Sequence, residues 1–167
     1  METIKGRVYK FGNDINTDVI YPGKYLSITT DREEMAKHCF EAVYPEFLKD
    51  GQPGDIIVAG KNFGCGSSRE QAATCLIYFG IRAIVAESFA RIFYRNAINL
   101  GLPVAVAPGV WGMFEHGDVI EIDLENGQVK NERTGVTAEC PKLPDFVLGI
   151  LGDGGLIAHL KKQLRKD

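Results

Sequence analysis

Residues 60–70 read Gly60-Lys61-Asn62-Phe63-Gly64-Cys65-Gly66-Ser67-Ser68-Arg69-Glu70. The apolar run before them, residues 56–59, predicts a short buried strand, and residues 71–79 predict a helix that ends before Gly80. Glycines between the two let the backbone turn sharply and approach a ligand closely. We therefore expect the two serines and the arginine at the N-terminus of the helix, where free N–H groups and the helix dipole favour a bound anion.

The same alternation of strand and helix continues downstream. Residues 83–86 and 102–106 predict two more apolar strands, and between them lies a helix that Ser88 is expected to cap and Gly101 to end. Short apolar strands that alternate with helices indicate parallel β-α-β units. Residues 4–11 predict a further strand with imperfect alternation.

Two other regions follow different patterns. A helix is predicted to begin at Thr30 or Asp31 and to end or kink at Pro45, with apolar residues at helical spacing, namely Met35, Cys39, Val43 and Phe47. Beyond Pro108-Gly109 the apolar period becomes two, and Asn126-Gly127 predicts a hairpin between antiparallel strands. Residues 146–151 and 156–164 predict closing helices. We expect one α/β domain over residues 1–167, with a mixed, partly parallel sheet flanked by helices.

Composition excludes several classes of function. The 167-residue chain carries a net charge of −3, without the basic face that nucleic-acid binding usually needs. No apolar run reaches the length of a membrane helix, and no signal peptide is predicted. The four cysteines are widely spaced and form no Cys-x-x-Cys pair, which predicts reduced thiols in a cytoplasmic protein rather than a disulfide or zinc framework.

The glycine-rich stretch fits none of three common motifs. A dinucleotide fingerprint needs a third glycine where Arg69 stands, a Walker loop needs Gly-Lys-Ser/Thr, and a nucleophile elbow needs a glycine after its serine. The plain alternative is that Ser67 or Ser68 merely caps the helix. Arg69 favours a ligand, because a cation at a helix N-terminus opposes the dipole and needs an anion, which a carboxylate substrate would supply.

Several motifs, in order, resemble the swivelling domain of aconitase-type hydro-lyases. They are Gly64-Cys65-Gly66-Ser67-Ser68-Arg69-Glu70, residues 82–86 and 88–92 after it, and residues 16–20 and 22–26 before it. The resemblance covers essentially the whole chain and implies a swivelling β/β/α domain. In length the chain is similar to the stand-alone small subunits of 3-isopropylmalate dehydratase and homoaconitase, not to a full aconitase.

The resemblance also implies a division of labour. In that family a large subunit carries a [4Fe-4S] cluster, so this chain would bind no metal or cofactor and would be inactive without that partner, in a heterodimer or heterotetramer. Ser67 matches the base that takes a proton from the carbon beside a carboxylate of a small dicarboxylate substrate. Ser68 matches a hydroxyl that binds substrate, Arg69 the carboxylate clamp, and Asp18 the family's active-site aspartate.

Substrate choice is expected in the segment after Pro22. Family members that handle an extra carboxylate have an arginine where Ser27 stands here, although Lys24 and Arg32 flank the segment. Ser27 supplies no cation, and Ile28 could face an apolar branch. The resemblance therefore implies isomerisation of 2-isopropylmalate and 3-isopropylmalate in leucine biosynthesis. The alternatives are the small subunit of a homoaconitase or a 2,3-dimethylmalate-type dehydratase, or a non-catalytic carboxylate-binding module.

Other residues near these motifs have ordinary explanations. Cys65, a cysteine without partners, is expected to pack rather than to bind a metal. Arg91 and Arg95 could reach substrate, but a structural role in ion pairs is favoured. Trp111 and Phe114 could be core residues or partner contacts, and the sequence leaves both possibilities open.

Overall fold

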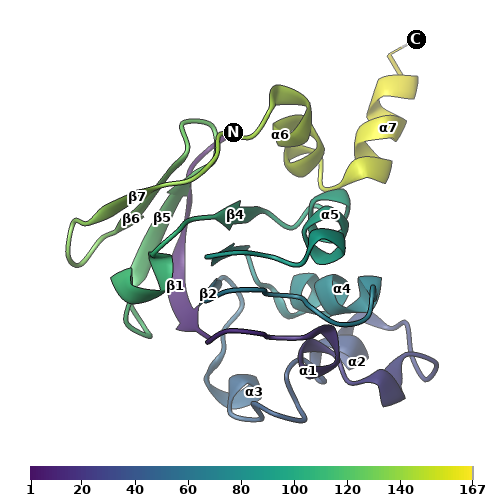
Figure 1. Cartoon of the computed structure of the whole chain (residues 1–167). Helices are drawn as coiled ribbons and strands as arrows, with labels where there is room; N and C mark the ends of the chain where they lie inside the picture. Colours follow the sequence, from purple (N-terminus) through teal and green to yellow (C-terminus); the bar gives the residue numbers. More distant parts are fainter. Residues whose placement is uncertain (167) are drawn as a thin grey trace.

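The computed structural model describes residues 1–166. Its strands form one mixed sheet in the order β4-β3-β2-β1-β5-β6-β7. β1 is the junction, because it pairs in parallel with β2 on one side and antiparallel with β5 on the other. In Figure 1 the antiparallel strands β5–β7 lie on one side of the molecule, and helices α4 and α5 lie on the other. The expected mixed, partly parallel α/β sheet is confirmed.

The parallel half follows the pattern predicted from the sequence. β2, β3 and β4 are short and apolar, and Gly80 ends α4 in the left-handed conformation with φ +107°. The elements are β1 (Ile4–Lys10), β2 (Ile56–Ala59), α4 (Glu70–Phe79), β3 (Ala83–Ala86), α5 (Arg91–Asn99) and β4 (Val104–Val106).

The antiparallel half is a meander closed by two helices. Gly127, with φ +74°, lies in the predicted turn between β5 and β6. The elements are the 3₁₀ helix η2 (Val110–Met113), β5 (Val119–Asp123), β6 (Gln128–Asn131), β7 (Thr137–Glu139), α6 (Asp145–Gly152) and α7 (Leu156–Leu164). Of the two aromatic residues left open, Phe114 is buried in the core, whereas Trp111 stays 45% exposed.

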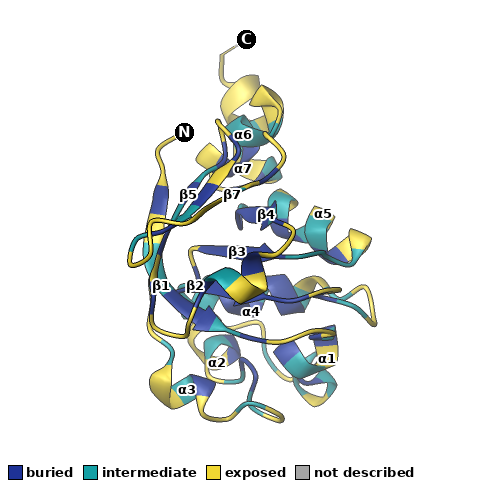
Figure 2. Cartoon of the chain, turned by 60° about the vertical axis from the view of Figure 1, so that its left-hand side comes forward, coloured by how far each residue is buried: buried dark blue, intermediate teal, exposed yellow. Residues whose placement is uncertain are grey.

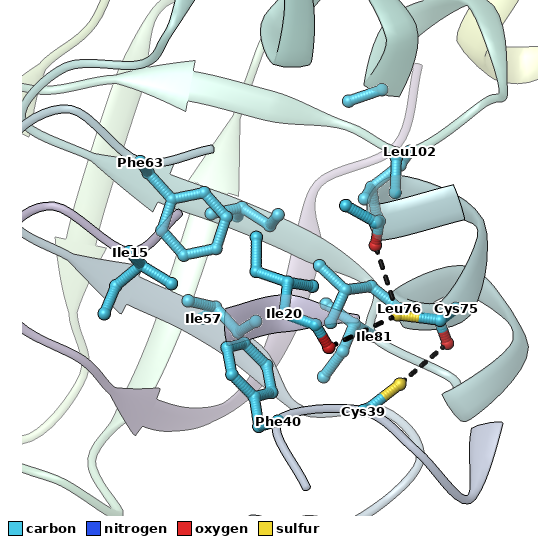
Figure 3. Packing of buried hydrophobic residues seen from close by; sticks show 14 of the residues in the cluster. Ile15, Ile20, Cys39, Phe40, Ile57, Phe63, Cys75, Leu76, Ile81 and Leu102 are labelled. Atoms are coloured by element: carbon cyan, nitrogen blue, oxygen red, sulfur yellow. Dashed lines mark hydrogen bonds between the residues drawn. The ribbon is translucent and has the colours of Figure 1, made fainter. Parts of the chain in front are cut away.

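Both faces of β2 and β3 are buried, as the dark central strands in Figure 2 show. Successive residues of a strand point to opposite faces. Ile57 of β2 therefore packs on one side, in a cluster that includes Phe40, Phe63 and Leu76, and Figure 3 shows these side chains together. Val58 packs on the other side in a second cluster. This two-sided burial explains why these strands are apolar without alternation.

The long helix predicted from Thr30 or Asp31 to Pro45 is wrong. Asp31 does cap a helix, since its side chain accepts from Glu34 N at 3.1 Å, but α2 spans only Arg32–Ala36, and the next helix is α3 (Phe47–Asp50). Phe40, with φ +58°, lies between them in the left-handed region, so the helix cannot continue through it. Core packing explains the turn: Phe40 is fully buried, whereas Val43 is 53% exposed.

Ser88 does not cap α5 as predicted. The N-cap residue is Ala90, and no side chain caps the helix. The Ser88 hydroxyl accepts instead from Asn62 N at 2.8 Å, so it fixes the loop after β2. Among residues 1–166, no helix combines the length and apolar character that crossing a membrane requires.

A buried carboxylate holds the antiparallel end of the sheet. Asp118 accepts from Arg133 Nε at 2.7 Å, from Asn131 Nδ2 at 2.9 Å and from Glu115 N at 2.9 Å. The Arg133 guanidinium, followed by these other donors, holds the pKa of Asp118 well below its usual range. The carboxylate therefore stabilises the fold at neutral pH.

We predict that Asp118→Asn lowers the free energy of unfolding by about 1–2 kcal/mol at pH 7. The folded-state pKa is depressed, so the contribution of Asp118 is present above the unfolded pKa of about 3.9 and is lost as the pH falls below it. Urea unfolding at pH 7 and at decreasing pH measures both quantities. The difference between wild type and variant should shrink in acid, and a constant difference would contradict the assignment.

Candidate functional site

The loops after β1 and β2 continue to pair beyond the ends of the strands. Gly64 N donates to Ile15 O at 2.7 Å, and Thr17 N donates to Cys65 O at 2.8 Å. These bonds place residues 15–17 beside residues 64–65, although about fifty residues separate the two segments in the sequence. The carboxyl ends of adjacent parallel strands are a common place for a ligand site in α/β sheets.

Residue 64 must be glycine because the loop lies very close to α5 at this point. It has φ +82°, and a Cβ atom there would overlap the Phe93 ring of α5. Gly66 also has a positive φ, +96°, but the nearest atom to a Cβ there is 3.5 Å away. Gly64 therefore lets the loop pack against α5, whereas Gly66 serves only the backbone turn.

The two serines precede α4, as predicted, but neither caps it. Arg69 is the N-cap residue, and no side chain accepts a hydrogen bond from the first turn. The capping explanation for Ser67 and Ser68 is therefore wrong. Both residues are exposed, and the hydroxyl of buried Thr17 donates to Ser67 O at 2.9 Å. Thr17 thus fixes the backbone of Ser67 and leaves its side chain free.

Arg69 already has an anionic partner within the chain. Its Nη1 donates to Asp18 Oδ1 at 2.9 Å, and the same oxygen accepts from Gly23 N at 2.8 Å. The Gly23 amide, followed by the Arg69 guanidinium, lowers the pKa of Asp18. Asp18 therefore supplies the compensating charge that the sequence assigned to a substrate, and it links Arg69 to the segment that begins at Gly23.

The predicted specificity residues lie farther along that segment. Ser27 and Ile28 are both exposed, Ile28 at 69%, after the 3₁₀ helix η1 (Gly23–Tyr25). In the described part of the chain, no hydrogen bond joins either residue to residues 67–69. Of the flanking cations, Lys24 lies over the Tyr25 ring at 5.1 Å and Arg32 over the Tyr78 ring at 4.8 Å.

Comparison with known proteins identifies the family of this chain. A model of the aconitase C-terminal domain matches residues 9–108, more than half of the chain. The chain belongs to the aconitase family. The small subunit 1 of 3-isopropylmalate dehydratase from Methanopyrus kandleri is 54% identical over 97% of this chain and 95% of its own length. The crystal structure of a 3-isopropylmalate dehydratase from Methanocaldococcus jannaschii matches with a TM-score of 0.90 and 46% identity, over 99% of this chain and 100% of that one.

Not all members of this aconitase group share one named activity. A relative from Methanocaldococcus jannaschii, 52% identical over 96% of this chain and 95% of its own length, is called an isopropylmalate/citramalate isomerase small subunit. Another from Methanothermobacter thermautotrophicus, 50% identical over 96% of this chain and 92% of its own length, is called a methanogen homoaconitase small subunit. The chain is thus a small subunit of the hydro-lyase type, and identity alone leaves its substrate open.

The cysteines of this aconitase-family chain do not form a cluster site. Cys39 and Cys75 are buried, and Cys39 Sγ donates to Cys75 O at 3.2 Å (Figure 3). Cys65 is half-buried, and burial raises the pKa of its thiol. Within residues 1–166, no group of three or more histidine, cysteine, aspartate or glutamate side chains gathers where it could hold a metal. These residues do not fit a cluster.

The structural role in ion pairs that was predicted for Arg91 and Arg95 is not observed among residues 1–166. Both are exposed on α5, and neither forms an ion pair or hydrogen bond through its side chain with another residue in the described range. By contrast, sequence reasoning missed two residues that hold the site, Thr17 and Gly23. Both lie within the quoted motifs, but their partners come from another loop or from the local turn, and no spacing rule predicts them.

We predict that Gly64→Ala lowers the free energy of unfolding by about 3 kcal/mol. Alanine at a positive φ costs about 1–2 kcal/mol, and overlap with Phe93 adds about 1–3 kcal/mol. Gly66→Ala is the matched control, because it has a similar φ and open space, so it should lose only the first amount. Urea unfolding of the two variants measures the difference, and equal losses would refute the role of the Phe93 contact.

Proposed function

We propose that the chain, with residues 1–167 as one swivelling domain, is the small subunit of a 3-isopropylmalate dehydratase. It would interconvert 2-isopropylmalate and 3-isopropylmalate in cytoplasmic leucine biosynthesis, and would be inactive alone. The observation that carries this proposal is the rim formed by exposed Ser67 and Ser68 and half-buried Arg69, in which Asp18 already orients the guanidinium. A large subunit would complete the site, and its [4Fe-4S] cluster would supply an open iron as Lewis acid for the substrate hydroxyl.

Ser67 is the proposed base. A serine takes a proton from carbon only as its alkoxide, after the hydroxyl proton has been lost, so the alkoxide must be stabilised. The first turn of α4 would provide that stabilisation once a large subunit excludes water, because no side chain caps its N–H groups and their partial positive charge lies directly after the loop. The Thr17 hydroxyl holds Ser67 O at 2.9 Å, so the backbone that presents the side chain is fixed. Ser67 would take the proton from the carbon beside a substrate carboxylate.

Ser68 and Arg69 would bind the substrate carboxylate. A guanidinium has five N–H donors in a planar fork, and only Nη1 is engaged by Asp18. The remaining donors can meet a carboxylate oxygen pair, while Asp18 keeps the plane of the fork in place. As the proton leaves carbon, negative charge grows on that carboxylate, so donors oriented in advance lower the barrier most.

The segment after Gly23 supports an alkyl-substituted malate. Ser27 carries no charge, Ile28 offers an exposed apolar side chain, and the nearby cations Lys24 and Arg32 lie over aromatic rings. Residue 27 therefore offers no cation to an additional carboxylate, although the exposed Lys24 and Arg32 lie nearby in the sequence. The homoaconitase alternative keeps support from the relative of that name at 50% identity. A 2,3-dimethylmalate-type dehydratase would use the same apolar contact with a smaller substituent.

We predict that reconstitution with the large subunit distinguishes an enzyme subunit from a non-catalytic carboxylate-binding module. The chain and its large subunit, reconstituted anaerobically with iron and sulfide, should dehydrate isopropylmalate, and neither should do so alone. Ser67→Ala should leave assembly intact and lower kcat by about 10²–10⁴-fold. Ser68→Ala is the neighbouring control and should raise KM about tenfold with a smaller effect on kcat. Near-normal turnover by Ser67→Ala would remove it as the base.

We also predict that Ser27→Arg changes substrate preference. The new cation would meet the additional carboxylate of homoaconitate and would leave the apolar branch of isopropylmalate without its surroundings. The ratio of kcat/KM for isopropylmalate to that for homoaconitate should fall by about 10²-fold or more. Wild-type enzyme that prefers the tricarboxylate would overturn the isopropylmalate assignment, and an unchanged ratio in the variant would remove residue 27 from the specificity site.

A further inference from the structure

Two arginines on α5 have no partner within the described chain. Arg91 is the first residue of the helix, and Arg95 follows one turn later, so both side chains lie on the same exposed face. Ile92 lies beside them and is 42% exposed. These three exposed residues of one helix form a patch with two positive charges and one apolar side chain. We call it the α5 patch.

Local charges make this patch unfavourable for the isolated chain. The first turn of α5 contains no acidic residue and its N-cap makes no side-chain hydrogen bond, so Arg91 opposes the helix dipole without compensation. Arg95 repels Arg91 at i,i+4 spacing. The contrast with Arg69 is direct, because Arg69 lies at the start of the neighbouring helix and is neutralised by Asp18. The α5 patch lacks such a partner among residues 1–166.

The patch continues the rim that carries the proposed base. Phe63 N donates to Ser88 O at 3.1 Å, and Ala90 N donates to Phe63 O at 2.9 Å, so the residues just before Arg91 run beside the loop that leads to Ser67. The loop has residues 15–17 on its other side. Asp18 with Arg69 and the α5 patch therefore flank the same glycine-rich loop.

We propose that the α5 patch is a contact surface for an acidic region of the large subunit. This inference rests on the proposed two-chain function. A protein partner fits better than substrate, because Arg91 and Arg95 are both exposed on α5 and Ile92 beside them is an exposed apolar side chain. Arginine beside an exposed aliphatic side chain is typical of contact surfaces between proteins. On a chain with net charge −3, a local pair of free cations gives the partner an electrostatic guide to orientation.

The test compares two matched charge reversals. Arg91→Glu/Arg95→Glu removes the patch, and Lys161→Glu/Arg165→Glu makes the same change in charge at the same i,i+4 spacing, on α7 and at its C-cap. Binding to the anaerobically reconstituted large subunit is measured by sedimentation at two salt concentrations. The α5 reversal should weaken binding about 100-fold and flatten its salt dependence, whereas the α7 reversal should change binding by less than about twofold. Arg91→Lys/Arg95→Lys should retain most of the salt dependence.

Four outcomes would overturn the proposal. If the wild-type complex forms and the α5 reversal does not weaken it, the α5 patch is not a contact surface, but the two-chain function is unaffected. A raised KM with unchanged assembly assigns the arginines to substrate. A lowered Tm of the isolated variant chain assigns them to the fold. Absence of any wild-type complex would overturn the surface together with the two-chain function. A complex without dehydratase activity would instead contradict the proposed function and leave the surface supported.

Discussion

Two backbone hydrogen bonds beyond the ends of β1 and β2 set the geometry of the site, from Gly64 N to Ile15 O and from Thr17 N to Cys65 O. They extend the parallel pairing of the two strands into their loops, so that residues from distant parts of the sequence share one rim. Each bond contributes only about 1 kcal/mol, yet each removes conformations that a glycine-rich loop would otherwise populate. These bonds therefore position the site residues more than they stabilise the fold.

The Asp18–Arg69 pair acts in the same way. The Asp18 side chain is 67% exposed and that of Arg69 is 26% exposed, so solvent screens their attraction and the pair contributes at most about 1 kcal/mol to folding. Its effect is geometric, because Asp18 also accepts from Gly23 N and thereby joins the arginine to the segment that contains Ser27. A Cβ at Gly23 would lie 3.0 Å from Arg69 Nη1, which shows how closely the two segments meet.

The sequence predicted the parallel half of the fold well, since short apolar runs and terminal glycines have local causes that hold in any context. It failed where packing overrides local pattern. The residues from Asp31 to Phe47 have helical spacing, but burial of Phe40 requires a left-handed residue in their midst. Serines before a helix usually cap it, yet here Arg69 takes the N-cap position and Ser88 bonds to another loop. The partner of Arg69, and the lack of one for Arg91 and Arg95 among residues 1–166, depend on which loops meet, and no periodicity encodes that.

Exposure of the rim bears on what kind of site it can be. Ser67 and Ser68 face water, where the field of a helix N-terminus is strongly screened and a serine alkoxide gains little. For the same reason, an open rim of this kind would hold a small carboxylate weakly on its own. A second surface that excludes water would strengthen both effects at once, since electrostatic interactions grow as the local dielectric constant falls. The exposed rim thus argues against a self-sufficient binding module and favours a site completed by another chain.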